Sequence, residues 1–216
     1  MSTDITHALR EVSALGGFFT LPTTVHRAPD SALTSPNSPS HFTGLARSVT
    51  ARYATDETRV GVSIAHLGLA ARVWSPTLAC ALLYGIVPDL DGLEWTGEGA
   101  ALRLAAPAAL PAEALFDQVD GVLRHVERTL PVKLAPRLLA GNMASALAGT
   151  ASVLSRTRPD LHPAILTRTR HLLTQGRLHN TGHLTPGPPL TFHRRSCCLY
   201  YRVPGGSVCG DCCFAG

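Results

Sequence analysis

The sequence predicts an α+β protein that is mostly helical, with a small β-hairpin and a short cysteine-rich metal-binding hairpin at its C-terminus. Three observations support this fold class. Several segments carry apolar residues at helical spacing, residues 92–106 alternate and turn on glycines, and five of the six cysteines lie between Cys197 and Cys213. With 216 residues, the chain can form one sizeable domain and a small appendage. We expect a mainly helical domain over residues 1–176 and a metal-binding segment over residues 177–216.

The first half of the chain predicts three helices. Residues 4–15 place apolar side chains on one face, and residues 45–56 are a second candidate. The Ser- and Pro-rich stretch 28–44 predicts a surface loop, with a functional lid as the alternative. A long helix is expected from Val60 to Gly85, bent or broken at Pro76.

The second half predicts a β-hairpin and three more helices. The glycine-rich stretch 92–106 forms the hairpin. Helices are expected over residues 111–130, 136–155 and 160–176. The first two begin with a proline, which suits the first position of a helix, and Asp160 can cap the third. Residues 177–192 are rich in turn residues and are expected to form the tether to the cysteine-rich tail.

Composition and charge exclude several functional classes. Hydrophobic residues make up 45% and charged residues 16% of the chain, as in an ordinary globular protein. The net charge of +4 is mild and the basic residues are scattered, so no nucleic-acid partner is expected. The N-terminus lacks the pattern of a secretion signal, and the longest apolar window, Val73 to Pro88, is too short to span a membrane. We therefore expect a cytoplasmic protein with no membrane span.

The cysteines of the tail have the spacing C-C-x10-C-x2-C. They are Cys197, Cys198, Cys209 and Cys212. Clustered cysteines in a cytosolic protein indicate metal or redox ligands rather than disulfides. Four thiolates can hold one tetrahedral metal ion or a small iron–sulfur cluster, and the spacing alone leaves zinc and iron–sulfur open.

The ten-residue spacer predicts how the two cysteine pairs meet. Residues 199–203 are aromatic and branched, which suits a strand, and Pro204 with the two following glycines predicts a turn. A short, uneven hairpin would bring Cys198 near Cys209. Because so short a hairpin is marginally stable alone, we expect the fold of the tail to depend on its metal.

The tail resembles a known family. Residues 194–202, Arg-Arg-Ser-Cys-Cys-Leu-Tyr-Tyr-Arg, followed by Cys209-Gly-Asp-Cys212, resemble the C-terminal signature of FhuF-type ferric-siderophore reductases. Residues 63–72 and 141–147 are similar to the family as well. The resemblance implies a 2Fe–2S cluster held by Cys197, Cys198, Cys209 and Cys212. Cys213 departs from the pattern, and we interpret it as a spectator thiol. The alternative is that Cys213 replaces Cys212 as a ligand.

The resemblance also implies a function. It is the one-electron reduction of siderophore-bound Fe(III) to Fe(II) through the 2Fe–2S cluster, which releases iron in the cytoplasm. Since the sequence has no nucleotide-binding fingerprint, we expect electrons to come from a ferredoxin or flavoprotein. Two alternatives stay open: a 2Fe–2S electron carrier or accessory protein without a siderophore pocket, and a zinc-stabilised interaction module.

Several polar residues are candidates for supporting roles. Arg194, Arg195 and Arg202 could offset the negative charge of the cluster and raise its reduction potential, or could be solvated side chains. Others lie in apolar helices, where core hydrogen bonding is the default role and lining a siderophore cleft is the alternative: His66, Arg72 and Asn142.

Overall fold

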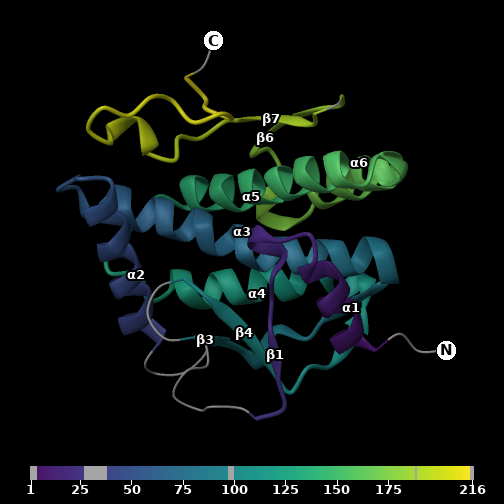
Figure 1. The fold of residues 1–216 in the computed structure, drawn as a ribbon. Helices are drawn as coiled ribbons and strands as arrows, with labels where there is room; N and C mark the ends of the chain where they lie inside the picture. Colours follow the sequence, from purple (N-terminus) through teal and green to yellow (C-terminus); the bar gives the residue numbers. More distant parts are fainter. Residues whose placement is uncertain (1–3, 27–37, 97–99, 188, 215–216) are drawn as a thin grey trace. The chain divides into compact units, whose positions relative to one another are not determined.

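The computed structural model describes residues 4–26, 38–96, 100–187 and 189–214 (Figure 1). Six α-helices and three small sheets make up the described residues, which confirms the predicted mostly helical α+β class. The chain divides into two compact units. One, here called the sheet unit, comprises residues 1–45 and 72–131. The other, the tail unit, comprises residues 46–71 and 132–216.

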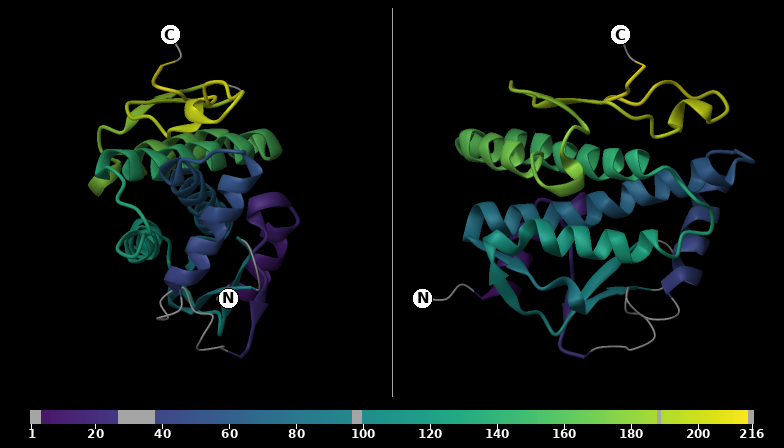
Figure 2. Two further views of the ribbon diagram at one scale, coloured as in Figure 1. Left: turned by 90° about the vertical axis from the view of Figure 1, so that its left-hand side faces the viewer. Right: turned by 180° about the vertical axis from the view of Figure 1, so that it is seen from behind.

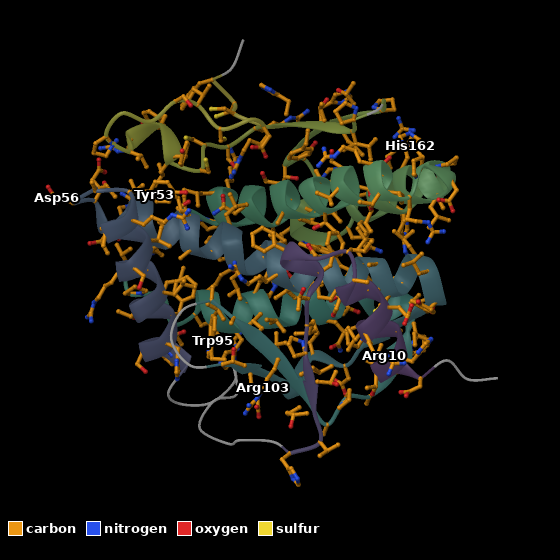
Figure 3. All side chains as sticks on the ribbon, in the orientation of Figure 1. Arg10, Tyr53, Asp56, Trp95, Arg103 and His162 are labelled. Atoms are coloured by element: carbon orange, nitrogen blue, oxygen red, sulfur yellow. The ribbon has the colours of Figure 1, made fainter. Side chains whose placement is uncertain are left out.

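The sheet unit is built around a three-stranded sheet of order β1-β4-β3. The strands are β1 (Thr23–Thr24), β3 (Leu93–Trp95) and β4 (Leu102–Ala105). Strands β3 and β4 form the antiparallel hairpin predicted within residues 92–106, and β1 adds to β4 in parallel. Trp95 and Arg103 lie on these strands (Figure 3), and Arg103 forms a salt bridge of 2.8 Å with buried Glu94 directly opposite.

Two helices and a two-stranded sheet complete the sheet unit. They are α1 (Ile5–Ser13), α4 (Leu115–Glu127) and the antiparallel pair β2 (Ile86–Pro88) with β5 (Ala109–Pro111). The buried positions of α1 and α4 recur every three or four residues, as expected for amphipathic helices on a core. The helix predicted over residues 4–15 is confirmed, and the one predicted over residues 111–130 is present but begins only at Leu115.

The tail unit stacks a hairpin on a helical layer. Its complete helices are α5 (Pro136–Thr157) and α6 (His162–Leu172), and its strands are β6 (Gly182–Thr185) and β7 (Thr191–Arg194). Both ribbon views show the antiparallel β6–β7 hairpin running beside α5 (Figures 1 and 2), with β7 in close contact with the helix. The later part of α2 (Ser38–Arg52) and the first half of α3 (Thr58–Tyr84) also belong to this unit.

Short 3-10 turns join several of these elements. They cover Gly17–Phe19, Leu90–Gly92, Ala112–Ala114, Pro159–Leu161, Gly176–Leu178 and Tyr200–Arg202.

Some predicted boundaries near prolines and caps are wrong. Of the loop expected over residues 28–44, residues 28–37 lie outside the described residues. The remainder is helical, because α2 begins at Ser38 and buries the ring of Phe42. Helix α3 continues through Pro76 without a break. Pro111 ends β5 instead of beginning a helix. Asp160 caps no helix, because its carboxylate binds Arg158.

The predicted structure of the residues leading into and through the tail is also wrong. The tether expected over residues 177–192 contains β6 and the first half of β7, which pair as a hairpin. Residues 199–203 form no strand: Leu199 has a left-handed φ of 70°, and a 3-10 turn follows. A chain that turns so soon after the cysteine pair cannot continue as an extended hairpin arm. The boundary at residues 176/177 between a helical domain and a cluster segment stays a prediction.

Two helices are long and apolar enough to cross a membrane by length and composition alone. They are α3 and α5, and 56% and 78% of their apolar windows, respectively, are buried within the protein. Such burial is typical of core helices in water-soluble proteins, so this observation is weak support for membrane insertion. The expectation that the chain has no membrane span stays a prediction.

Candidate metal centre

Strand β7 carries the chain into the cysteine-rich tail. Its side chains alternate, with Phe192 and Arg194 buried and Thr191 and His193 exposed. This alternation directs the Arg194 side chain toward α5, where its Nη2 donates to Oδ1 of Asn142 at 2.8 Å. The guanidinium lies so close to the helix that a Cβ on Gly141 would be 2.8 Å from Nη2. A larger residue at this position would displace the Arg194 guanidinium or the Ser196 hydroxyl.

The tail is attached to the helices by hydrogen bonds on both sides of the cysteine pair. Ser63 Oγ donates to the carbonyl oxygen of Cys198 at 2.7 Å. Ser145 Oγ is hydrogen-bonded to the Asp211 carboxylate, and the backbone carbonyl of Asp211 accepts from the Arg194 N–H at 3.0 Å. Residues of α3 and α5 thus fix both ends of the cysteine motif.

The 3-10 turn between the cysteine pairs is held at its outer side. Arg202 Nε lies 2.8 and 2.9 Å from the two carboxylate oxygens of Glu57, just before α3. Tyr200 packs edge-on against Tyr53, with ring centroids 5.7 Å apart; Tyr53 is labelled in Figure 3. Exposed ion pairs stabilise little, so the aromatic contact is the more persistent anchor.

The fold brings the thiols of Cys198 and Cys209 together. Their sulfurs are 3.4 Å apart, which confirms the predicted proximity of these two residues although the hairpin is absent. Cys212 lies close to both, and Cys198 and Cys212 are buried. All six cysteines are free thiols, so no disulfide competes for the ligands.

Backbone N–H groups point at two further sulfurs. The Leu199 N–H donates to Sγ of Cys197 at 3.2 Å, and the Phe214 N–H donates to Sγ of Cys212 at 3.4 Å. Such hydrogen bonds stabilise a thiolate and are one of the means by which proteins tune iron–sulfur centres.

Within the part of the chain that the structure describes, no group of three or more His, Cys, Asp or Glu side chains has the arrangement of a single-ion metal site. Two irons bridged by sulfide offer ligand positions further apart than one ion does. The ligand set Cys197, Cys198, Cys209 and Cys212 stays a prediction.

Without a metal, the thiols of the tail favour their protonated forms. Burial raises the pKa of Cys197, although the Leu199 N–H opposes the rise. Burial, together with the hydrogen bond to Cys198, raises the pKa of Cys209 further. Binding of a metal requires thiolates, so it must release protons here.

Arg194 is a buried cation beside these thiols. Its side chain is fully buried, and its charge lowers the pKa of Cys197 and Cys213, opposing the rise caused by burial. Nη2 contacts Asn142 and the Leu138 carbonyl, whereas Nε and Nη1 have no hydrogen-bond partner among the described residues. Burying an unpaired charge is costly, so an anion at the thiols would stabilise this arrangement.

The other two arginines near the motif are exposed. Arg195 donates from Nη1 to Oδ1 of Asn180 at 3.1 Å, and Arg202 pairs with Glu57. Of the three arginines considered in the sequence, only Arg194 is buried.

Comparison with known families agrees with the motif. Residues 194–214 match the model of the FhuF 2Fe-2S C-terminal domain. Over these residues the tail is similar to the FhuF 2Fe–2S domain. No curated protein matches the chain.

This FhuF domain indicates a 2Fe–2S cluster as the cofactor. The residues fit such a group: the donors are thiols, two of them receive backbone N–H bonds, and Arg194 supplies an unbalanced positive charge. An all-thiolate 2Fe–2S centre carries a formal charge of about −2 when oxidised and about −3 when reduced. The charge of the site and that of the cofactor are complementary.

The structure also shows what joins the two upstream stretches. Residues 63–72 and 141–147 meet where Asn142 Nδ2 donates to the Ser63 carbonyl oxygen (2.9 Å), and both residues contact the tail or Arg194. Core hydrogen bonding was the default prediction for Asn142 and is confirmed. The supporting roles of Ser63 and Ser145 had no signal in the residue types themselves, since serine is common in such helices.

The structure also places the remaining candidates. Arg72 stacks its guanidinium over the Phe18 ring at 4.7 Å, within the sheet unit. His66 is fully buried in the tail unit. Cys213 is half-buried near Cys197 and Cys212, as its electrostatic interactions with them show.

Proposed function

We propose that the protein is a ferric-siderophore reductase, which transfers one electron to siderophore-bound Fe(III) and releases Fe(II). The observation that carries the proposal is the FhuF 2Fe–2S domain at residues 194–214, on a site whose buried cation fits an anionic cluster. When bound, the cluster supplies a one-electron redox couple. The coarser conclusion, an iron–sulfur protein related to siderophore-iron reductases, follows from the family match itself.

The chemistry of the substrate explains why one electron suffices. Siderophores hold Fe(III) through hard oxygen donors, which bind a trivalent ion more tightly than a divalent one. The electron enters from a donor protein, which becomes oxidised, and leaves on the iron of the substrate. We propose a ferredoxin or flavoprotein as this donor.

The residues of the chain hold and expose the redox site. Ser63, Asn142 and Ser145 keep the tail on α3 and α5, and Arg194 offsets the charge that a reduced centre carries. Cys197 and Cys209 are only half-buried, so electron exchange at the surface needs no opening of the fold. We place the reaction in the cytoplasm, where free thiols stay reduced.

The proposal is tested on anaerobically purified protein. The cluster is reduced by a chemical or protein donor, and ferric siderophores are then added while a ferrous-specific chelator reports Fe(II). We expect re-oxidation of the cluster in step with Fe(II) formation. A cluster that cycles without accelerating the reduction would identify an electron carrier, and a colourless protein containing zinc would identify the interaction module.

A further inference from the structure

A basic pocket lies next to the cysteine motif in the tail unit. It has a volume of about 430 Å³ and lies between the start of α5, the 3-10 turn after α6 and the chain just after β7. This volume is within the range of small-molecule sites. The lining residues are Arg137, Ala140, Arg177, His179, Asn180, Thr181, Arg195 and Ser196. We call this site the arginine pocket.

The lining has a strong positive charge. Three of its eight residues are arginines, and none is an aspartate or glutamate. Arg177 is half-buried, whereas Arg137 and Arg195 are exposed at the surface. Arg137 forms no ion pair with any carboxylate in the described residues. Arginine binds carboxylates through paired N–H donors in a fixed geometry, so the pocket favours an oxygen-rich anion.

The neutral residues of the pocket are held in place by the fold. Ser196 Oγ donates to the Arg137 carbonyl oxygen at 2.9 Å, which joins the tail to the start of α5. Asn180 Oδ1 accepts from Arg195 Nη1. The lining contains no Phe, Tyr or Trp, and His179 is its one aromatic ring.

The pocket is adjacent to the redox site along the chain. Ser196 lines it, and Cys197, the first predicted cluster ligand, is the next residue, with consecutive Cα atoms about 3.8 Å apart. A ligand bound here therefore lies near the backbone of Cys197. The same α5 segment that borders the pocket carries Gly141 and Asn142, which hold Arg194.

We propose that the arginine pocket binds the carboxylate groups of the ferric chelate, and that the substrates are therefore anionic, carboxylate-bearing chelates. This inference rests on the proposed reductase function and adds the substrate class to it. The arginines draw the negative chelate to the side of the tail where Cys197 lies. Cationic or neutral hydroxamate chelates gain nothing from this lining.

Binding is tested with gallium(III) chelates, which have the charge and shape of the ferric ones but are not reduced. The cluster-loaded protein is titrated calorimetrically with gallium(III) citrate, with cationic gallium(III) desferrioxamine and with inorganic phosphate. The variants are Arg137→Gln and Arg177→Gln. Arg170→Gln on α6 is the matched control. Arg170 is exposed in the same unit, and its substitution removes the same charge from outside the pocket.

We expect wild type and Arg170→Gln to bind gallium(III) citrate equally, and each pocket variant to bind it about tenfold more weakly, the size of a lost charged hydrogen bond. KM for ferric citrate should rise with kcat and the reduction potential unchanged. Unaltered citrate binding in both pocket variants, or phosphate competing as strongly as the chelate, overturns the proposal. So does a pocket variant that weakens only the reaction with an acidic donor protein.

These outcomes are distinct from a failure of the reductase function. If wild type reduces hydroxamate chelates but does not bind the citrate chelate, the pocket proposal is wrong and the reductase stands. If wild type binds gallium(III) citrate in the pocket but reduces no ferric chelate, the reductase function is wrong. Circular dichroism and the cluster absorbance of each variant verify that it is folded and loaded.

Discussion

Arg194 donates a hydrogen bond to Asn142 over 2.8 Å, and both side chains are fully buried. Asn142 continues the chain of hydrogen bonds to Ser63, which in turn donates to the carbonyl oxygen of Cys198. The only buried arginine of the cysteine motif is thus connected to the backbone of a predicted cluster ligand. Substitutions along this series of hydrogen bonds are therefore expected to alter the properties of the redox centre.

Removal of the buried charge should lower the reduction potential. In Arg194→Gln, the more negative reduced cluster loses a buried cation in a medium of low dielectric constant. At a fixed ambient potential we expect the ratio of reduced to oxidised cluster to fall about tenfold, which corresponds to about 59 mV. A redox titration followed by electron paramagnetic resonance measures this ratio. Arg202→Gln removes an exposed charge that solvent screens, and it should change the ratio of reduced to oxidised cluster far less. Equal changes in the two variants would contradict the role of burial.

Removal of the amide that holds Arg194 should destabilise the protein. Asn142→Ala leaves Arg194 and the Ser63 carbonyl without this partner in the core, and we expect a loss of about 2–4 kcal/mol in the free energy of unfolding. Urea denaturation of the cluster-free protein measures it. Ser152→Ala, on the same helix, removes a hydroxyl that accepts from exposed Arg156 and should cost less than about 1 kcal/mol. Similar values for the two variants would show that the Asn142 contacts are weak.

Two glycines of α5 offer a matched test of close packing. A Cβ on Gly141 would meet Ser196 Oγ and Arg194 Nη2, whereas a Cβ on Gly149 has no atom within 4 Å. We therefore expect Gly141→Ala to displace the tail and reduce the iron bound per chain. Gly149→Ala should keep the iron and gain up to about 1 kcal/mol in stability, as alanine does within helices. Full iron content in Gly141→Ala would show that Arg194 need not lie against the helix.

Cys80 provides a pH test outside the metal centre. Burial raises its pKa to about 12, above the usual value of 9.0. Because the folded state favours the protonated thiol, its contribution to stability is full below about pH 9 and is lost as the pH rises towards 12. Wild type should therefore lose more stability than Cys80→Ala between neutral and alkaline pH, measured as the denaturation midpoint of the cluster-free proteins. Parallel losses would contradict the assigned pKa.

The sequence predicted the helices well because their apolar periodicity is strong. Helices α1 and α4 bury a single face, as their apolar spacing predicts. Helix α5, buried on most sides, begins at the predicted Pro136. The prediction at Asp160 was wrong because its carboxylate pairs with Arg158 instead of capping the helix. At Pro76 the helix is not broken, although a break was one of the two predicted outcomes. The turn residues of 182–194 hid two short strands whose pairing buries Phe192 and Arg194.

The cysteine motif could be found from spacing, but its surroundings could not. The proximity of Cys198 and Cys209 was predicted, yet by a hairpin that the left-handed Leu199 rules out. The three arginines near the motif looked equivalent in the sequence. Only the strand alternation and the contact with α5 single out Arg194, and the arginine pocket arises from segments that are far apart in the chain.

The most direct test of the account is the content of iron and acid-labile sulfide in the anaerobically purified protein. We predict about two irons and two sulfides per chain in wild type and in Cys213→Ser, and a large loss of both in Cys198→Ser and Cys209→Ser. One zinc per chain without sulfide, or full iron and sulfide in Cys198→Ser and Cys209→Ser, would contradict the 2Fe–2S centre.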